Sequence, residues 1–312
     1  MVKQMQQIKR PRRPIDGILL FDKPQGMSSN QALQRVKYLY QAEKAGHTGS
    51  LDPLATGLLP ICLGEATKYS QHLLEANKVY RTTMRLGQKT TTADAEGEII
   101  QERDVPALSL ADIEKVLAQF RGTIQQVPSM YSALKKDGKP LYELARKGIE
   151  VAREPRTIQI YRLELLRVES LYWELEVACS KGTYIRNLVE DIGDVLGCGA
   201  HVSELRRIAT GCFSLDAQSM TLNGLQALEQ QQGLTALDAL LLPPWAAIAN
   251  KPKVTLTGHS AYYLLHGNPV QVSHLPHNED VLIFDEQQRF LGLGCMNDDG
   301  LLAPKRLLKT AY

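Results

Sequence analysis

Runs of apolar residues, some alternating with polar ones, predict three strands in the first two thirds of the chain. Residues 15–21 form a short apolar run that ends at Asp-Lys-Pro-Gln-Gly, where proline and glycine stop an extended segment. Residues 78–86 fit a second strand. Over residues 173–179 apolar side chains alternate with glutamates, so we expect one face of this strand to be buried and the other wet.

Apolar residues at helical spacing predict three helices. The first covers about residues 30–40 and follows Ser28, which opens a capping-box sequence. The second follows Ser109, and its apolar positions fall on one face. The third starts after Thr183 and stops at Gly197, a typical residue for a helix end.

From Pro252 onward the pattern changes to short apolar runs separated by pairs of Gly, Asn and Asp, without a long helix. This pattern predicts a small β-rich domain. Prolines at 242–245 and 250–252 mark its boundary with a preceding helical stretch. Two domains also fit a chain of 312 residues.

Composition favours an ordinary soluble protein. No apolar run approaches the roughly 18 to 20 residues that a membrane helix needs, and the N-terminus is polar and basic. We therefore expect a cytoplasmic protein. Its five cysteines are widely spaced and include no Cys-x-x-Cys pair, which predicts reduced thiols.

The net charge is only +2, but the basic residues are unevenly distributed. Residues 1–13 carry five cations and no acid, and residues 135–156 hold seven basic residues against four acidic ones. The C-terminus adds Lys305, Arg306 and Lys309. Such clusters can meet the phosphates of a nucleic acid, while a solvated tail is the alternative for the first cluster.

One carboxylate stands out in a segment rich in glycine. Residues 45–57 hold three glycines and Pro53, which predicts a loop instead of a helix or a central strand. Asp52 lies in this loop, and Pro53 biases it toward an extended conformation. The residue types alone leave two interpretations: a carboxylate presented to a ligand, or an ordinary turn aspartate.

The whole string at 46–57, Gly-His-Thr-Gly-Ser-Leu-Asp-Pro-Leu-Ala-Thr-Gly, closely resembles motif II of the TruB family, the bacterial tRNA pseudouridine-55 synthases. Further matches occur in family order up to about residue 210, at 22–29, 78–80, 182–186, 197–201 and 205–207, and more loosely at 128–133. Ser50 and Asn187 depart from the family pattern, which often has alanine and serine there. Neither departure touches a required functional group.

The resemblance implies an α+β protein with the pseudouridine synthase catalytic fold, in which helices and loops flank a central mixed or antiparallel sheet. Residues 1–13 would form a flexible basic arm, and residues 14–250 the catalytic domain. A thumb-like RNA-binding insertion is expected at about 130–155. Residues 251–312 would form a C-terminal PUA-like RNA-binding domain.

The implied activity is isomerisation of uridine 55 in the T-loop of tRNA to pseudouridine, with the base flipped out of its stack. Asp52 matches the essential aspartate, which can act as nucleophile or as base. Arg186 matches the arginine that pairs with it, and such a pair is expected to lower the carboxylate pKa. Tyr80 matches the tyrosine that stacks on the target base.

Five further residues match positions that bind the substrate. Tyr184 and Leu205 would line the uridine pocket, and His47 would enter the T-loop. Lys23 lies beside the active-site loop, where a cation could meet a phosphate. Asp94 matches another family acid, for which we expect a role in RNA positioning.

The thumb-like insertion supplies the expected RNA contacts, namely Lys135, Lys136, Lys139, Arg146 and Lys147. The resemblance implies tRNA as the partner and a monomeric protein, without a cofactor, a metal or a membrane.

Two other classes of protein fit parts of the sequence. A non-catalytic RNA-binding protein would explain the basic clusters and aromatic residues, but it leaves the Asp52 loop unexplained. A zinc-dependent base deaminase needs His-x-Glu followed by Pro-Cys-x-x-Cys, and the sequence contains neither. His201 lies three residues after Cys198, but no second ligand pair accompanies them.

Overall fold

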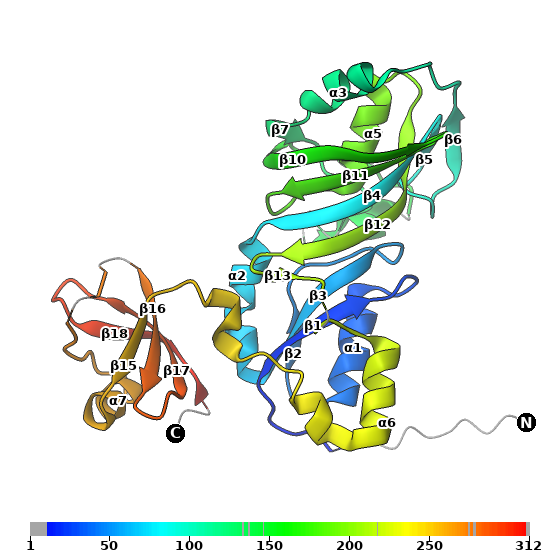
Figure 1. Cartoon of the computed structure of the whole chain (residues 1–312). Helices are drawn as coiled ribbons and strands as arrows, with labels where there is room; N and C mark the ends of the chain where they lie inside the picture. The colour runs from blue at the N-terminus through cyan, green and yellow to red at the C-terminus, as the bar shows by residue number, and fades with distance from the viewer. Residues whose placement is uncertain are drawn as a thin grey trace, which may run out of the picture.

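The computed structural model describes residues 11–132, 134–136, 138–145, 147–216, 218–273, 275–276 and 279–309. Figure 1 shows an elongated body built on one large sheet, with a smaller β domain at its side. None of the described helices is long and apolar enough to cross a bilayer. All five cysteines are free thiols, as the sequence predicted.

The large sheet has the strand order β14-β1-β3-β12-β4-β11-β10-β7, with β2 added to β3 and β13 to β12. Two pairings, β1 with β14 and β12 with β3, are parallel and the others are antiparallel, which confirms the expected mixed sheet. The strands are β1 (Gly17–Lys23), β2 (Ala45–His47), β3 (Thr56–Leu63), β4 (Lys78–Leu86), β7 (Gly122–Gln126), β10 (Arg156–Glu169), β11 (Tyr172–Cys179), β12 (Ala200–Thr210), β13 (Phe213–Ser214) and β14 (Met220–Thr221). A separate hairpin joins β5 (Gln88–Thr90) to β6 (Ile99–Glu102).

The three helices predicted from the sequence begin where expected. The capping boxes of Ser28 and Ser109 are both formed, and Gly197 follows the third predicted helix with a φ of 81°. The helices are α1 (Ser29–Leu39), α2 (Ser70–Glu75), α3 (Leu110–Ala118), α5 (Ile185–Val195) and α6 (Leu222–Asp238), with 3-10 turns η1 (Gly64–Tyr69) and η2 (Pro244–Ile248). Helices α1 and α6 lie together at the β1–β3 end, whereas α3 and α5 cover the other half of the sheet.

The prediction of one loop over residues 45–57 was wrong at both ends, because β2 covers residues 45–47 and β3 starts at Thr56. Strand β3 tolerates Gly57 because that residue lies directly against the backbone of Arg207 on β12. A Cβ atom at Gly57, where φ is 102°, would lie 2.3 Å from the Arg207 carbonyl oxygen. The true loop therefore runs over residues 48–55, between two strands of the sheet.

The C-terminal part is β-rich, as predicted, with β15 (Lys253–Leu256), β16 (Asp280–Asp285), β17 (Phe290–Met296) and β18 (Leu302–Leu307) in one sheet. It also contains a short helix that the sequence did not predict, α7 (Gly258–Leu265). Tyr69, Trp245 and Ile248 pack against Phe284 and Phe290 of this sheet. An apolar cluster therefore joins the two parts of the chain.

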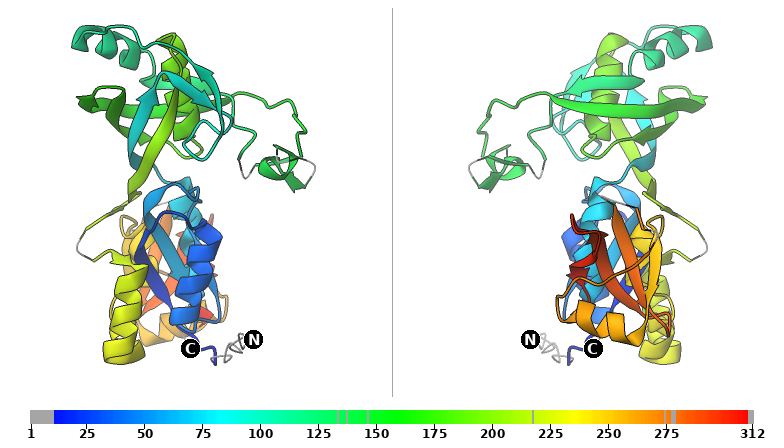
Figure 2. Two further views of the ribbon diagram at one scale, coloured as in Figure 1. Left: turned by 90° about the vertical axis from the view of Figure 1, so that its right-hand side faces the viewer. Right: turned by 90° about the vertical axis from the view of Figure 1, so that its left-hand side faces the viewer.

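The segment expected to act as a thumb extends away from the main body, as Figure 2 shows. Its described elements are β8 (Lys135–Lys136), β9 (Lys139–Pro140) and α4 (Leu141–Ala145). The described part of this segment joins the sheet at β7 and at β10.

Candidate active site

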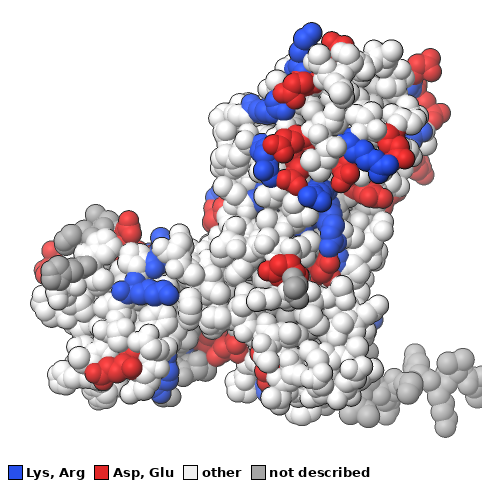
Figure 3. Space-filling view, in the orientation of Figure 1, with Lys and Arg blue, Asp and Glu red and all other residues white. Residues whose placement is uncertain are grey.

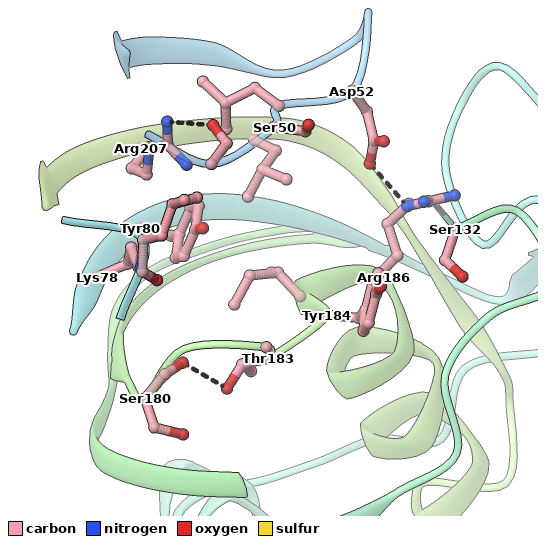
Figure 4. A pocket seen from close by; sticks show the side chains of 16 residues that line it. Ser50, Asp52, Lys78, Tyr80, Ser132, Ser180, Thr183, Tyr184, Arg186 and Arg207 are labelled. Carbon is pink, nitrogen blue, oxygen red and sulfur yellow. Dashed lines mark hydrogen bonds and ion pairs between the residues drawn. The ribbon is translucent and has the colours of Figure 1, made fainter. Parts of the chain in front are cut away.

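A cavity of about 300 Å³ lies where the loop at residues 48–55 faces the start of α5 (Figure 4). Strands β4 and β12 contribute to its lining, and residues from five separate parts of the chain meet there. Its lining includes Gly49, Ser50, Leu51, Asp52, Leu74, Lys78, Tyr80, Ser132, Ser180, Gly182, Thr183, Tyr184, Ile185, Arg186, Leu205 and Arg207. The cavity brings together five residues that the sequence singled out, namely Asp52, Tyr80, Tyr184, Arg186 and Leu205.

Asp52 and Arg186 form an ion pair beside this cavity (Figure 4). The Nε atom of Arg186 lies 3.0 Å from Oδ2 of Asp52, and the Asp52 side chain remains 41% exposed. Arg186 itself is buried and fully engaged, because its Nη1 donates to the Thr92 carbonyl (3.0 Å) and its Nη2 to the Tyr131 carbonyl (2.9 Å). The guanidinium therefore holds a fixed position while the carboxylate stays accessible.

Asp94 lies behind Arg186 and is buried. Its Oδ2 is 3.4 Å from Nη1 of Arg186, and its Oδ1 accepts hydrogen bonds from the Thr92 hydroxyl and the Glu96 N–H. The sequence comparison with the family led us to expect a role in RNA positioning, and this location places the Asp94 carboxylate against Arg186. The Asp94 carboxylate is covered, and its contact toward the cavity runs to Arg186.

The electrostatics of Asp52 also differ from the expectation that pairing would lower its pKa. Burial among the cavity atoms raises the pKa of Asp52 above its ordinary value, and Arg186 offsets only part of this effect. Asp94 adds a further upward contribution to the same pKa, whereas Lys23 lowers it. Arg186 therefore limits the upward shift without reversing it.

The loop that carries Asp52 is anchored on both sides. The Ser29 hydroxyl bonds both the N–H (2.7 Å) and the carbonyl (3.1 Å) of Leu51, and the Gly26 N–H donates to the Pro53 carbonyl (2.8 Å). From β12, Arg207 donates to the Gly49 carbonyl (3.1 Å). These contacts fix the backbone on both sides of Asp52. The loop therefore holds its conformation without a ligand.

Lys23 does not have the position that a phosphate contact requires. Its side chain is completely buried, and Nζ donates to the carbonyls of Pro24 (2.8 Å) and Met27 (2.6 Å). Burial lowers the pKa of Lys23 to about 8. We therefore correct the expected role: Lys23 secures the turn before α1, which packs against the Asp52 loop.

Two tyrosines face the cavity from different elements (Figure 4). Tyr80 projects from β4 and is 9% exposed; burial raises its pKa, and the positive charge of Arg207 acts in the opposite direction. Tyr184 is the residue directly before α5, and burial raises its pKa as well. Leu205 on β12 adds an apolar surface. Together these three side chains offer faces against which a planar ring can pack.

His47 ends β2 just before the loop and is half-buried, but it is not among the described residues that line the cavity. Burial, assisted by the positive charge of Arg207, lowers the pKa of His47. Both effects favour the neutral form of the imidazole.

The basic side chains expected in the thumb are only partly described by the structure. Lys139 and Lys147 are exposed, and for Lys135 and Lys136 only the backbone of β8 is described. Arg146 lies outside the described residues, as do residues 1–10 of the expected basic arm. Its last residue, Arg13, is not flexible as expected, because it forms an ion pair with Asp238 and donates to the Tyr40 carbonyl. On the face shown in Figure 3, basic and acidic side chains are interspersed, in line with the small net charge.

Two residues within the matched segments, for which the sequence indicated no role, line the cavity. Arg207 is buried, and besides Gly49 it binds the Leu58 carbonyl (2.7 Å) through Nε. Lys78 donates to the carbonyls of Leu73, Leu74 and Ala76 at the end of α2, and burial lowers its pKa to about 8. Among the residues that the structure describes, no group of three or more His, Cys, Asp or Glu side chains could hold a metal ion.

Comparison with solved structures defines the class of protein. The chain is 27% identical to a chain of the crystal structure of a Cbf5-Nop10-Gar1 complex, with a TM-score of 0.70 over 93% of this chain and 84% of that chain. It is 26% identical to a chain of an H/ACA RNP bound to a substrate RNA containing 2'-deoxyuridine, with a TM-score of 0.69 and the same coverage. The fold is that of the Cbf5 and TruB type of pseudouridine synthase.

Sequence comparisons are more specific. Residues 37–185 match the model of the TruB family pseudouridylate synthase N-terminal domain, and residues 186–248 and 252–308 match two TruB C-terminal domain models. Proteins named tRNA pseudouridine synthase B from Stutzerimonas stutzeri (strain A1501) and Pseudomonas aeruginosa (strain UCBPP-PA14) are each 56% identical over 98% of this chain and 100% of their own length. The chain therefore belongs to the TruB family of pseudouridylate synthases.

Proposed function

We propose that this protein isomerises uridine 55 in the T-loop of tRNA to pseudouridine. Family membership defines the reaction class, and the relatives that match over their whole length are named for tRNA. The reaction breaks the N1–C1′ bond, turns the uracil and joins its C5 to C1′. A proton leaves C5 and N1 gains one, so the overall change is an isomerisation that needs no external reactant.

The observation that carries the proposal is the accessible carboxylate of Asp52, held 3.0 Å from a buried arginine beside a cavity. An ionised carboxylate there can attack C1′ of the ribose or remove a proton from the sugar. Both routes require the charged form, which the Arg186 guanidinium favours. The anchored loop supplies the fixed orientation that either route needs.

A flipped uracil would enter the cavity between Tyr80 and Tyr184. Extruded bases are commonly held by stacking on aromatic and apolar side chains, and Tyr80, Tyr184 and Leu205 supply such surfaces. His47, in a site that favours its neutral form and outside the cavity lining, would instead contact the T-loop from which the base is withdrawn. Asp94 would serve by fixing Arg186.

The remaining RNA would be held outside the cavity. The proposed thumb carries exposed Lys139 and Lys147, whose ammonium groups suit phosphate contacts, and we include Lys135, Lys136 and Arg146 from the sequence. The C-terminal part, residues 251–312, would contact the tRNA on the acceptor-stem side. We propose that the protein works as a monomer in the cytoplasm.

The experiment is to incubate the protein with a T-arm transcript and to map modified nucleosides along the RNA. Pseudouridine at position 55 is expected, in a reaction that EDTA leaves unchanged. A transcript with cytidine at position 55 is the matched control and should stay unmodified. Failure to form any pseudouridine on the uridine transcript would favour a protein that only binds RNA, whereas modification elsewhere would contradict the assignment to position 55.

A further inference from the structure

The junction of β7 and α5 contains a buried amide that none of the roles above uses. Gln126 is the last residue of β7, and its side chain is 3% exposed. Its Nε2 donates to the Tyr184 carbonyl (3.0 Å), and its Oε1 accepts from the Tyr184 N–H (2.8 Å). One side chain therefore bonds both backbone polar groups of a residue in the cavity wall, whose carbonyl also accepts from the Leu188 N–H (3.1 Å).

The position of Tyr184 explains why such a partner is needed. Tyr184 is the N-cap of α5, in an extended conformation with φ −98° and ψ 108°, and its side chain makes no capping hydrogen bond. Its N–H lies before the helix, so it has no partner within α5, and a buried N–H without a partner is costly. Gln126 supplies the pair of hydrogen bonds that a neighbouring strand would otherwise provide.

The same turn of α5 carries the cavity residues Tyr184, Ile185 and Arg186. It is also joined to the segment after Gln126, because Asn187 Nδ2 donates to the Val127 carbonyl (3.1 Å) and Arg186 donates to the Tyr131 carbonyl. Tyr184 and Arg186 are only two residues apart in the sequence. A rotation of the backbone at Tyr184 would therefore move the aromatic ring and the guanidinium together.

We infer that Gln126 is a positioning residue for the reaction: its carboxamide fixes the backbone of Tyr184 and, through it, the geometry of the Tyr184 ring and of Arg186 against Asp52. The inference rests on the proposed function. Gln126 is not among the described residues that line the cavity, so it acts on substrate through Tyr184 and Arg186. Its effect belongs to the chemical step, because its side chain is only 3% exposed and offers no surface to RNA.

Three variants separate these effects. Gln126→Met removes both hydrogen bonds at similar size, and Gln126→Glu keeps the acceptor for the Tyr184 N–H but places an anionic oxygen against the Tyr184 carbonyl. Gln125→Met is the matched control, because Gln125 is exposed and its Nε2 bonds the Thr157 hydroxyl. Single-turnover rates, RNA dissociation constants and thermal unfolding midpoints are measured for each variant.

For both Gln126 variants we expect the single-turnover rate constant to fall at least about tenfold, since small misplacements of reacting groups are costly. RNA affinity should change by less than about threefold, and the Gln125 control should match the wild type. Wild-type rates in both Gln126 variants would overturn the inference. So would loss of RNA affinity in proportion to the loss of rate. The Gln126→Glu variant decides the matter if Gln126→Met does not fold.

A double-mutant cycle with Tyr184→Ala tests whether Gln126 acts through Tyr184. The effect of Gln126→Met should be smaller in the Tyr184→Ala background than in the wild type, and equal effects in both backgrounds would contradict the inference. The wild-type arm separates this inference from the proposed function. An inactive wild type would refute the proposed function itself, whereas an active wild type with equally active Gln126 variants would refute only the positioning role.

Discussion

Arg186 holds Asp52 at 3.0 Å while its own guanidinium is held by two backbone carbonyls and by Asp94. The arginine is thus the fixed partner, and the aspartate is the one that reaches the cavity. The pKa of Asp52 is raised by burial, lowered by Arg186 and raised by Asp94. Removing the charge of Arg186 or of Asp94 should therefore shift, in opposite directions, the pH at which activity falls on acidification (the acid limb).

The first prediction concerns this acid limb. In Arg186→Gln, loss of the positive charge should raise the pKa of Asp52 further, so the single-turnover rate should fall at a higher pH than in the wild type. In Asp94→Asn, loss of a negative charge should shift the limb to lower pH. Rate constants measured between pH 4 and 8 check both signs, and limbs that coincide in all three proteins would contradict a catalytic carboxylate at Asp52.

The second prediction concerns Lys23, which is buried against the carbonyls of Pro24 and Met27. Lys23→Met should reduce the rate through the Asp52 loop but leave the salt dependence of RNA binding unchanged. A lysine that neutralises a phosphate would change the slope of log K against log salt by about 0.7 to 0.9. If Lys23→Met changed the slope by that amount, the result would support the phosphate contact expected from the sequence and contradict the structural role.

The third prediction concerns the thumb. Replacing the exposed Lys139 and Lys147 with glutamine should weaken tRNA binding and lower the salt slope by about 0.7 to 0.9 for each lost phosphate contact. Lys115→Gln on α3 is the control, since that side chain is 76% exposed and lies on a different part of the body. An unchanged slope in the double variant would remove these two lysines from the RNA interface.

The fourth prediction concerns Arg207, which is buried and bonds the carbonyls of Gly49 and Leu58. Arg207→Met leaves these carbonyls without their donor, so the free energy of unfolding should fall by about 2 kcal/mol. Its neighbour Arg206 forms an ion pair with Asp22 at 43% exposure, and Arg206→Met should cost less than about 1 kcal/mol. Urea unfolding checks both values, and equal losses would show that Arg207 does not anchor the loop.

The sequence predicted the elements whose signals are local. The capping box at Ser28, the alternation over residues 173–179 and the glycine stop at Gly197 each act within one turn or one strand, and the structure contains all three. The loop at 45–57 was misjudged because Gly57 belongs to a strand for a long-range reason, its contact with the Arg207 backbone. No pattern within the loop itself records that contact.

For the candidate site, too, the sequence indicated local motifs but not long-range contacts. Motif resemblance located Asp52, Tyr80, Tyr184, Arg186 and Leu205, and the fold brings these residues to one cavity. It could not show that Lys23 is buried, because its charge is satisfied by backbone carbonyls whose position depends on the turn. Gln126 was missed for a similar reason: its partner Tyr184 lies 58 residues further along the chain. Side-chain chemistry is visible in a sequence, but the partner of a buried polar group is not.

The most direct test of the central claim is the single-turnover rate of Asp52→Asn on a T-arm transcript, measured beside its RNA affinity. Asparagine keeps the shape of the side chain but cannot act as an anionic nucleophile or base. Asp104→Asn, an exposed residue, is the control. We predict no detectable pseudouridine with Asp52→Asn and an RNA dissociation constant within about tenfold, or about 1.4 kcal/mol, of the wild type. Substantial pseudouridine formation by Asp52→Asn would contradict the account.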